Sequence, residues 1–336
     1  MRRSLLLLVS LLVLLAAGPV ALAQDDGVVP DPVEEEPAPD VEPKDGKLRL
    51  KLLNGLYFQG KRYFTRGQTV RLRGRARPFV KGQRVKLQIK RVGRRGVTKT
   101  VRLRKAKGRN AGQFKLSFAR SGRAPYVIKA THRRTAAQRG FSDSQRLRVL
   151  DNSAGLGSDG RHVKLLQKGL RRLGYAGFWP SGHFGPGTAR AVLAFRKVNG
   201  LGRVGYASTA VFKRVFNKRG SFKLKYPNAG KHVETDLSRQ VLVLAKNGKP
   251  VKTYHTSSGK ASTPTVLGSF RFYRKDAGTN GVGMVHSNYF IGGYAIHGYH
   301  SVPTYPASHG CLRVPIPDAW NIYSWIDIGD RIFVYR

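Results

Sequence analysis

The chain has 336 residues, with 62 lysines and arginines against 18 aspartates and glutamates, which gives a formal net charge of +44 at pH 7. Hydrophobic residues make up 40% of it, enough for ordinary folded cores, and the length predicts roughly two or three domains. There is one cysteine, Cys311, so a disulfide bond within the chain is excluded.

Residues 1–23 have the three regions of an export signal. Arg2 and Arg3 form the basic start, residues 5–17 are apolar, and Ala21-Leu22-Ala23 is the expected cleavage site. The apolar stretch is shorter than the about 20 residues that span a bilayer, so we predict a cleaved signal peptide. An uncleaved membrane anchor is the alternative. The mature protein is then expected outside the cytoplasmic membrane, in the cell wall or periplasmic space.

Charge is distributed very unevenly along the chain. Residues 24–46 hold nine of the 18 acidic residues and are rich in proline, which predicts a disordered acidic leader. Residues 47–336 then carry 59 basic and nine acidic residues, a charge of about +50. A protein this basic is expected to bind an anionic polymer. Export argues against nucleic acid as the physiological partner and favours anionic wall polymers or lipid head groups.

Residues 47–150 alternate apolar and polar residues in short runs, as strands with one buried and one solvated face do. Turns with glycine or proline about every ten residues favour an all-β immunoglobulin-like sandwich. The region has 32 basic residues and one acidic residue, Asp143, which predicts electrostatic retention on the wall. A basic surface kept for solubility is the alternative. The apolar positions that carry the strand prediction are Val85, Leu87, Ile89, Phe114, Leu116, Phe118, Tyr126, Ile128 and Ala130.

Residues 155–218 change to helical periodicity and predict a small three-helix bundle. The first helix is expected to stop at Gly174, the second to be capped by Thr188 and to end near Gly200, and the third to be capped by Ser208. The apolar positions are Val163, Leu166, Leu170 and Leu173 in the first helix, Ala189, Val192 and Phe195 in the second, and Val211, Val215 and Phe216 in the third.

Two segments of this bundle carry a recognisable pattern. They read Val163-x-x-Leu166-Gln167-x-x-Leu170-x-x-Leu173-Gly174-Tyr175 and Gly182-x-Phe184-Gly185-x-x-Thr188-x-x-Ala191-Val192-x-x-Phe195. In them the bundle resembles the small peptidoglycan-binding domain of wall enzymes, although Arg196 stands where that family usually has glutamine. The resemblance implies a wall-binding module. A kept fold that has lost its binding is the alternative.

Residues 221–336 return to strands, expected over 241–244, 268–273, 294–297 and 332–335, with hairpin turns at Asn247-Gly248 and Gly281. Four segments here are Ser258-Gly259, Thr263-Pro264-x-x-x-Gly268-x-Phe270, Tyr289-Phe290-x-Gly292-Gly293-x-Ala295-Ile296-His297-Gly298 and Ser308-His309-Gly310-Cys311-Leu312-Arg313. Together they resemble the L,D-transpeptidase (YkuD-like) catalytic domain. The expected fold is therefore multidomain, with a β-sandwich, a three-helix bundle and a mainly-β catalytic domain.

Cys311 is predicted to be a catalytic nucleophile, because a thiolate attacks acyl groups strongly. An inert buried cysteine and an intermolecular disulfide are the alternatives. A histidine must take the thiol proton and later protonate the leaving amine. We assign this role to His297, which ends a predicted strand and from which the chain returns to Cys311 within fourteen residues. His309 is the alternative base.

Other residues of these motifs are assigned supporting roles. Gly310 permits backbone conformations closed to other residues, so N–H groups near it can point at a developing oxyanion. Ser308 and His309 are placed with it, as support for the oxyanion or the turn. Arg313 is predicted to receive a substrate carboxylate bidentately, with a plain surface arginine as the alternative. Gly298 and Tyr289 are assigned to substrate binding.

The resemblance also implies the reaction. Such enzymes attack the bond between an L-centred diamino acid and the following D-Ala of a tetrapeptide stem, form a thioester on cysteine, and pass the acyl group to a stem amine or to water. No cofactor or metal is expected, because the nine histidines are scattered, and His232, His255 and His286 are read as ordinary surface or core residues. The alternatives are an L,D-carboxypeptidase of the same fold, a non-catalytic wall-binding protein and a nucleic-acid binder.

Overall fold

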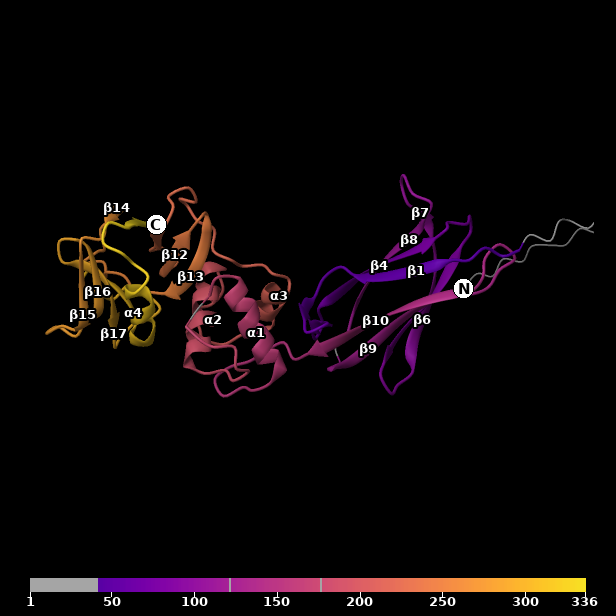
Figure 1. Cartoon of the computed structure of the whole chain (residues 1–336). Coiled ribbons are helices and arrows are strands. Elements are labelled where there is room, and N and C mark those ends of the chain that lie inside the picture. The colour runs from indigo at the N-terminus through magenta and orange to yellow at the C-terminus, as the bar shows by residue number, and fades with distance from the viewer. Residues whose placement is uncertain (1–41, 121, 176) are drawn as a thin grey trace, which may run out of the picture. The chain divides into compact units, whose positions relative to one another are not determined.

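The computed structural model describes residues 42–120, 122–175 and 177–336 (Figure 1). The predicted export signal and nearly all of the acidic leader lie outside the described residues. Across the described ranges, every helix is too short or too polar to cross a membrane.

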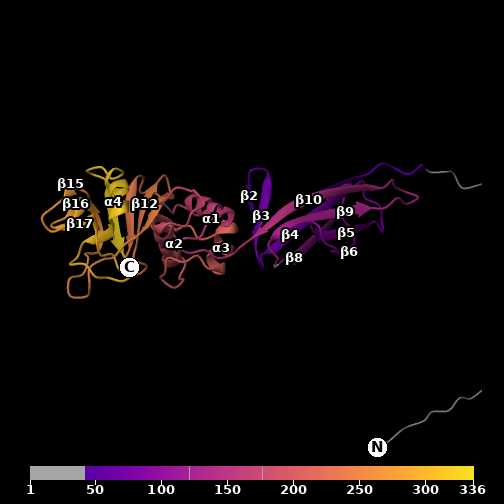
Figure 2. The ribbon, with the colours of Figure 1, turned by 90° about the horizontal axis from the view of Figure 1, so that it is seen from below.

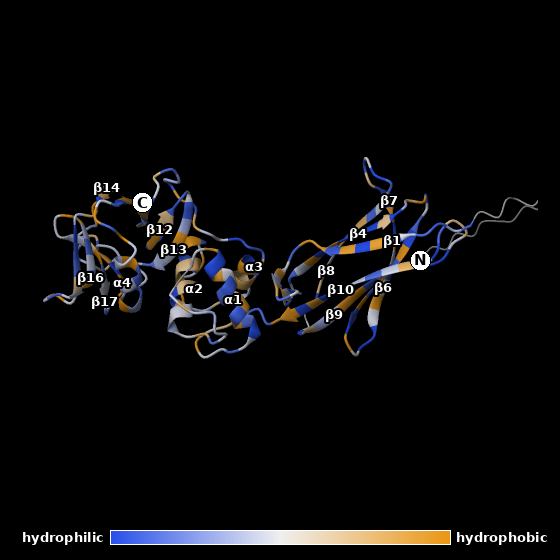
Figure 3. Ribbon diagram, in the orientation of Figure 1, coloured by the Kyte–Doolittle hydropathy of each residue, from blue (hydrophilic) through white to orange (hydrophobic). Residues whose placement is uncertain are grey.

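Residues 47–150 form two sheets that share one core, and Figure 3 shows β1 (Lys47–Leu52) banded in alternating blue and orange. In β1 and in β4 (Thr69–Arg77) every second side chain is buried, because successive side chains of a strand point to opposite faces. The strands are, in order across the first sheet, β1 (Lys47–Leu52), β4 (Thr69–Arg77), β8 (Gly112–Ala119) and β7 (Arg104–Lys105), and across the second, β2 (Leu56–Phe58), β3 (Lys61–Thr65), β10 (Phe141–Leu150), β9 (Ala124–His132), β5 (Arg84–Arg91) and β6 (Gly96–Arg102).

The three runs that predicted strands in this β domain (residues 47–150) fall in β5, β8 and β9. Val85, Leu87 and Ile128 are almost completely buried between the sheets. Each such side chain contributes about 1.5–3 kcal/mol through its removal from water. The burial therefore explains why a region this rich in like charge still folds.

Residues 155–218, the helical module, contain α1 (Arg161–Arg172), α2 (Pro186–Val198) and α3 (Thr209–Phe216). Gly174 has φ +88° just beyond α1, as predicted. Ser208 occupies the N-cap position of α3, as predicted, but its side chain makes no capping hydrogen bond and instead accepts one from Arg196. The prediction for Thr188 is wrong. The helix already begins at Pro186, whose missing N–H costs nothing in the first turn. Thr188 is buried inside it and its Oγ1 accepts a hydrogen bond from Gln167 Nε2 at 2.9 Å.

The C-terminal region, residues 221–336, is built from two further sheets around one apolar core, with one helix, α4 (Ile316–Tyr323). Asn247 and Gly248 have φ values of 52° and 69° and join β12 (Val241–Lys246) to β13 (Lys249–His255) as a tight hairpin turn, as predicted. The first sheet has the order β13 (Lys249–His255), β12 (Val241–Lys246), β11 (His232–Asp236), β19 (Arg331–Tyr335), β14 (Gly268–Arg271), and the second β15 (Arg274–Thr279), β16 (Val285–Ile291), β17 (Tyr294–Tyr299), β18 (Leu312–Pro315).

The helical module packs directly on the C-terminal region, with α2 lying against β12 and β13 (Figures 1 and 2). The Thr253 N–H donates to the Gly174 carbonyl at 2.7 Å. Arg190 binds Asp318 with two hydrogen bonds, Nε to Oδ2 at 2.8 Å and an Nη to Oδ1 at 3.3 Å. Because Asp318 is buried, this bidentate pair fixes α2 to α4 in a defined orientation.

Candidate active site

A parallel strand pair brings His297 and Cys311 to one place. β17 and β18 are in register at Ile296 with Leu312 and at His297 with Arg313. Cys311 immediately precedes β18 and so lies level with Ala295. Residues two apart on a strand share a face, which puts the side chains of His297, Cys311 and Arg313 on the same side of the sheet. The register of β17 and β18, which the sequence alone does not predict, thus brings His297 and Cys311 together.

The hydrogen bonding of His297 identifies its basic nitrogen. Its Nδ1 lies 2.9 Å from the Gly298 carbonyl oxygen, and a carbonyl only accepts, so Nδ1 carries the proton. Nε2 is then left with a lone pair that can accept a proton. The ring is only 3% exposed, and burial lowers the pKa of His297 below its usual range, with the Arg313 charge lowering it further. The imidazole is therefore neutral near pH 7.

The thiol of Cys311 is also neutral at rest. Burial raises its pKa above the ordinary value, while a backbone hydrogen bond from Ala295 and the nearby Arg313 charge oppose this shift. Sγ lies 3.5 Å from the Gly293 carbonyl oxygen, to which the thiol donates. A neutral thiol beside a neutral imidazole requires proton transfer to accompany attack, as in a general-base mechanism.

The turn before Cys311 is held by Ser308. Its Oγ donates to the Cys311 carbonyl at 2.6 Å and accepts from the Gly310 N–H at 3.1 Å. Gly310 has φ +118°, and a Cβ there would lie 2.3 Å from Cε1 of Tyr294, closer than real contacts allow. Glycine is thus required twice over at this position, by the backbone conformation and by the neighbouring ring.

The sequence motifs of the C-terminal region meet around this turn. Thr265 Oγ1 donates to the Gly310 carbonyl at 2.6 Å, and Thr263 Oγ1 donates to the Ser308 carbonyl at 3.1 Å. The Gln240 side chain holds the adjoining Ser258 twice. Its Oε1 accepts from the Ser258 backbone N–H at 2.8 Å, and its Nε2 donates to Ser258 Oγ at 2.7 Å. Sequence reasoning missed Thr265, Tyr294 and Gln240. The first two flank or lie within quoted motifs, whereas Gln240 carries no local signal.

The remaining predicted residues are placed less uniformly. His309 is exposed. Arg313 lies with its guanidinium 4.2 Å from the Tyr299 ring centre. Gly298 packs against α4, where an added Cβ would lie 2.8 Å from the Cβ of Ala319. Only the carbonyl of Gly298 contacts the site, through His297. Tyr289 pairs with Ala295 across β16 and β17, but it is 6% exposed beneath Arg274.

Comparison with known proteins matches two parts of the chain. A family model described as L,D-transpeptidase catalytic domain (YkuD) matches residues 230–334, and a model of a peptidoglycan binding domain matches residues 159–214. No curated protein matches the chain.

Among solved structures, two L,D-transpeptidases are similar to parts of this chain. An L,D-transpeptidase from Xylanimonas cellulosilytica is 34% identical, with a TM-score of 0.51, and the match covers 55% of this chain and 98% of that one. An L,D-transpeptidase from Stackebrandtia nassauensis is 25% identical, with a TM-score of 0.35, over 55% of this chain and 96% of that one. With nearly the whole of a 34% identical relative covered, the chain belongs to the L,D-transpeptidase family.

Proposed function

We propose that the protein is an exported cysteine acyltransferase that forms cross-links in peptidoglycan. His297 Nε2 takes the Cys311 proton as sulfur attacks the amide carbonyl before the terminal D-Ala of a tetrapeptide stem. The C–N bond breaks, D-Ala leaves with that proton, and a thioester remains on Cys311. An acceptor amine then attacks the thioester, gives a proton back through His297, and frees the thiol. The placement of His297 and Cys311 on one face of the β17–β18 pair carries this proposal.

Supporting residues have defined parts in this scheme. The Gly310 N–H is already bound to Ser308 Oγ, so the Cys311 N–H is the donor we assign to the oxyanion. Ser308 and Gly310 hold the turn that aims it. Arg313 supplies positive charge for a substrate carboxylate, and Gly298 orients the His297 ring through its carbonyl.

The domain layout follows from the same proposal. Residues 1–23 are the signal peptide, 24–46 the acidic leader, 47–150 an immunoglobulin-like β-sandwich, 155–218 a three-helix peptidoglycan-binding module and 221–336 the catalytic domain. The partner is peptidoglycan, and the site of action is the cell wall or periplasmic space. The surplus of basic residues in 47–150 supports an additional attraction to anionic wall polymers or a lipid surface.

Incubation of the purified protein with a disaccharide-tetrapeptide tests the reaction. We expect a dimer that has lost one alanine, identified by mass spectrometry. An L,D-carboxypeptidase of the same fold would instead release alanine and leave only the disaccharide-tripeptide. A protein that forms neither the dimer nor the disaccharide-tripeptide, yet still pellets with wall sacculi, would be a non-catalytic wall binder, and the acyltransferase proposal would be wrong.

A further inference from the structure

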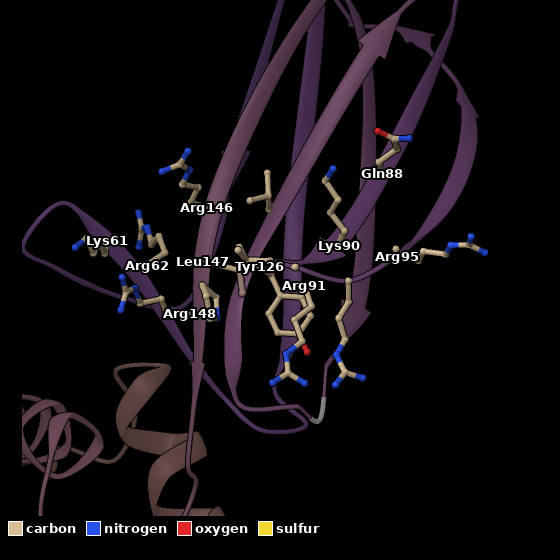
Figure 4. A pocket seen from close by; sticks show the side chains of 16 residues that line it. Lys61, Arg62, Gln88, Lys90, Arg91, Arg95, Tyr126, Arg146, Leu147 and Arg148 are labelled. Carbon is tan, nitrogen blue, oxygen red and sulfur yellow. The ribbon is translucent and has the colours of Figure 1, made fainter.

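The outer face of the second sheet of the β domain contains a cationic hollow of about 1130 Å³. Figure 4 shows basic side chains reaching it from separate strands. Arg62 comes from β3, Lys90 from β5, and Arg146 and Arg148 from β10, while Arg94 and Arg95 come from the β5–β6 hairpin. The hollow thus gathers cations from three segments that are distant in sequence.

No carboxylate lines this hollow, and none of these six side chains forms an ion pair within the described ranges. Arg146 and Arg148 lie two apart on β10 and so on the same face of the sheet, where their like charges repel. The acidic leader cannot neutralise the domain. Residues 24–46 carry nine acids and one lysine, whereas residues 47–150 carry 32 bases and one acid. Most of the positive charge of the domain is therefore left for an anion from outside the chain.

We propose that this hollow binds a linear phosphodiester polymer, an inference that rests on the proposed retention of the enzyme at the wall. Arginine predominates, and its planar fork matches phosphate oxygens bidentately. A phosphodiester polymer keeps one negative charge per repeat at any physiological pH. A strand of polymer can lie within a hollow, whereas the flat surface of a membrane cannot reach its floor.

The first sheet of the same domain supplies a matched control. Its outer face is also basic, with Arg49, Arg71 and Arg73 on β1 and β4 and Lys115 on β8 opposite Arg73. These four residues do not line the hollow. Replacing them with glutamine removes the same four charges, from three arginines and one lysine, as replacing Arg62, Lys90, Arg146 and Arg148.

Binding of the full chain to poly(glycerol phosphate) is measured over a range of salt concentrations. The hollow variant replaces Arg62, Lys90, Arg146 and Arg148 with glutamine, and we expect it to bind at least about tenfold more weakly. The slope of log K against log[salt] should become about three less steep, near 0.7 for each lost phosphate contact. The control variant should lose much less. Equal loss in both variants would overturn the hollow as a site while leaving charge-driven retention intact. Tighter binding to polyglutamate or to phosphatidylglycerol vesicles would overturn the choice of partner, and no binding by the wild type would overturn retention itself.

A second and independent observation concerns the loop between His297 and Cys311. Lys197, in the last turn of α2, is 4% exposed, and its Nζ lies 3.0 Å from the Gln240 carbonyl, 3.1 Å from the Thr256 carbonyl and 2.7 Å from His255 Nδ1. Three acceptors require the three N–H donors of an ammonium group. Nδ1 of His255 therefore accepts, and its Nε2–H donates to the Val302 carbonyl at 2.9 Å.

Arg203, also from the helical module, holds the same loop. One Nη donates to the Thr304 carbonyl at 2.6 Å and the other to the Ser238 carbonyl at 3.0 Å. The loop then continues into the catalytic turn, where Ala307 and Ser308 both donate their N–H groups to the Ser258 carbonyl. Arg203 thus holds the backbone that leads to Cys311 directly, and Lys197 holds it through His255.

We infer that Lys197 and Arg203 are positioning residues, through which docking of the helical module sets the geometry of the acylation site. This inference rests on the proposed thioester chemistry. Burial lowers the pKa of Lys197 to about 7, a cost that its three acceptors offset in part. A module that only tethered the enzyme to the wall would not need a buried lysine at this position.

The test compares Lys197→Met and Arg203→Gln with Lys213→Met and Arg172→Gln, exposed positions of the same module. Carbapenem acylation of Cys311 is followed by mass spectrometry, and hydrogen exchange is measured over residues 300–307. We expect the first pair to acylate about 10- to 100-fold more slowly at saturation, with faster exchange in the loop. Arg203→Lys should recover part of the rate.

Arg203→Gln keeps this test decisive if Lys197→Met does not fold. Wild-type acylation rates and wild-type exchange in Arg203→Gln would overturn the positioning role. A wild-type protein that is never acylated would instead overturn the proposed acyltransferase function.

Discussion

Cys311→Ala is expected to abolish both thioester formation and cross-linking, a loss of at least about 10³-fold. The chain contains no second cysteine to replace it. A hydroxyl or water in the same place is a far weaker nucleophile at neutral pH, so Cys311→Ser should be nearly as inactive. Mass spectrometry after incubation with a carbapenem or a tetrapeptide stem measures the acyl adduct directly.

The fold should tolerate the substitution, which makes the loss interpretable. The thiol donates only one long contact, at 3.5 Å to the Gly293 carbonyl, while the turn is held by Ser308 and Thr265. Thermal unfolding and pelleting with sacculi should therefore match the wild type. An acyl adduct on Cys311→Ala, or cross-linking at the wild-type rate, would remove the thiol from the mechanism.

Local periodicity predicted the elements that depend on a buried stripe. Val163, Leu166 and Leu170 lie buried along α1, and Val85 and Leu87 along β5. In contrast, β6 is exposed almost throughout and so lacks the alternation that marks a strand. These residues form a strand because they pair with β5, and no pattern within β6 itself indicates that pairing. The Thr188 prediction failed for a related reason, since the proline two residues earlier starts the helix.

Contacts between distant segments account for most of what the sequence did not predict at the site. His255 was read as an ordinary residue, yet it meets Lys197, 58 positions earlier in the chain. Arg203 and Thr304 are 101 positions apart. Motif reading locates the groups that react, because their types and spacing are dictated by chemistry. It does not locate groups that hold backbone carbonyls, because any long donor at the right point in space will serve.

His297→Gln is expected to slow acylation by about 10²- to 10⁴-fold at neutral pH, the usual contribution of a general base. In the wild type, burial lowers the pKa of His297, so the imidazole stays neutral to a lower pH than an ordinary histidine does. The acylation rate should therefore hold steady near neutrality and fall in acid, as the ring gains a proton. The rate of carbapenem acylation, measured from pH 4.5 to about pH 9.5, gives this profile.

The variant should lose this acid limb and instead gain rate steadily with rising pH. Burial raises the pKa of the Cys311 thiol, so without a base the reactive thiolate forms only in alkaline solution. His309→Gln is the matched control, because His309 is exposed and lies two residues from the same sulfur. It should keep the wild-type profile. If the acid limb vanished in His309→Gln and persisted in His297→Gln, the base would be His309, and the strand register that places His297 beside the thiol would serve structure alone.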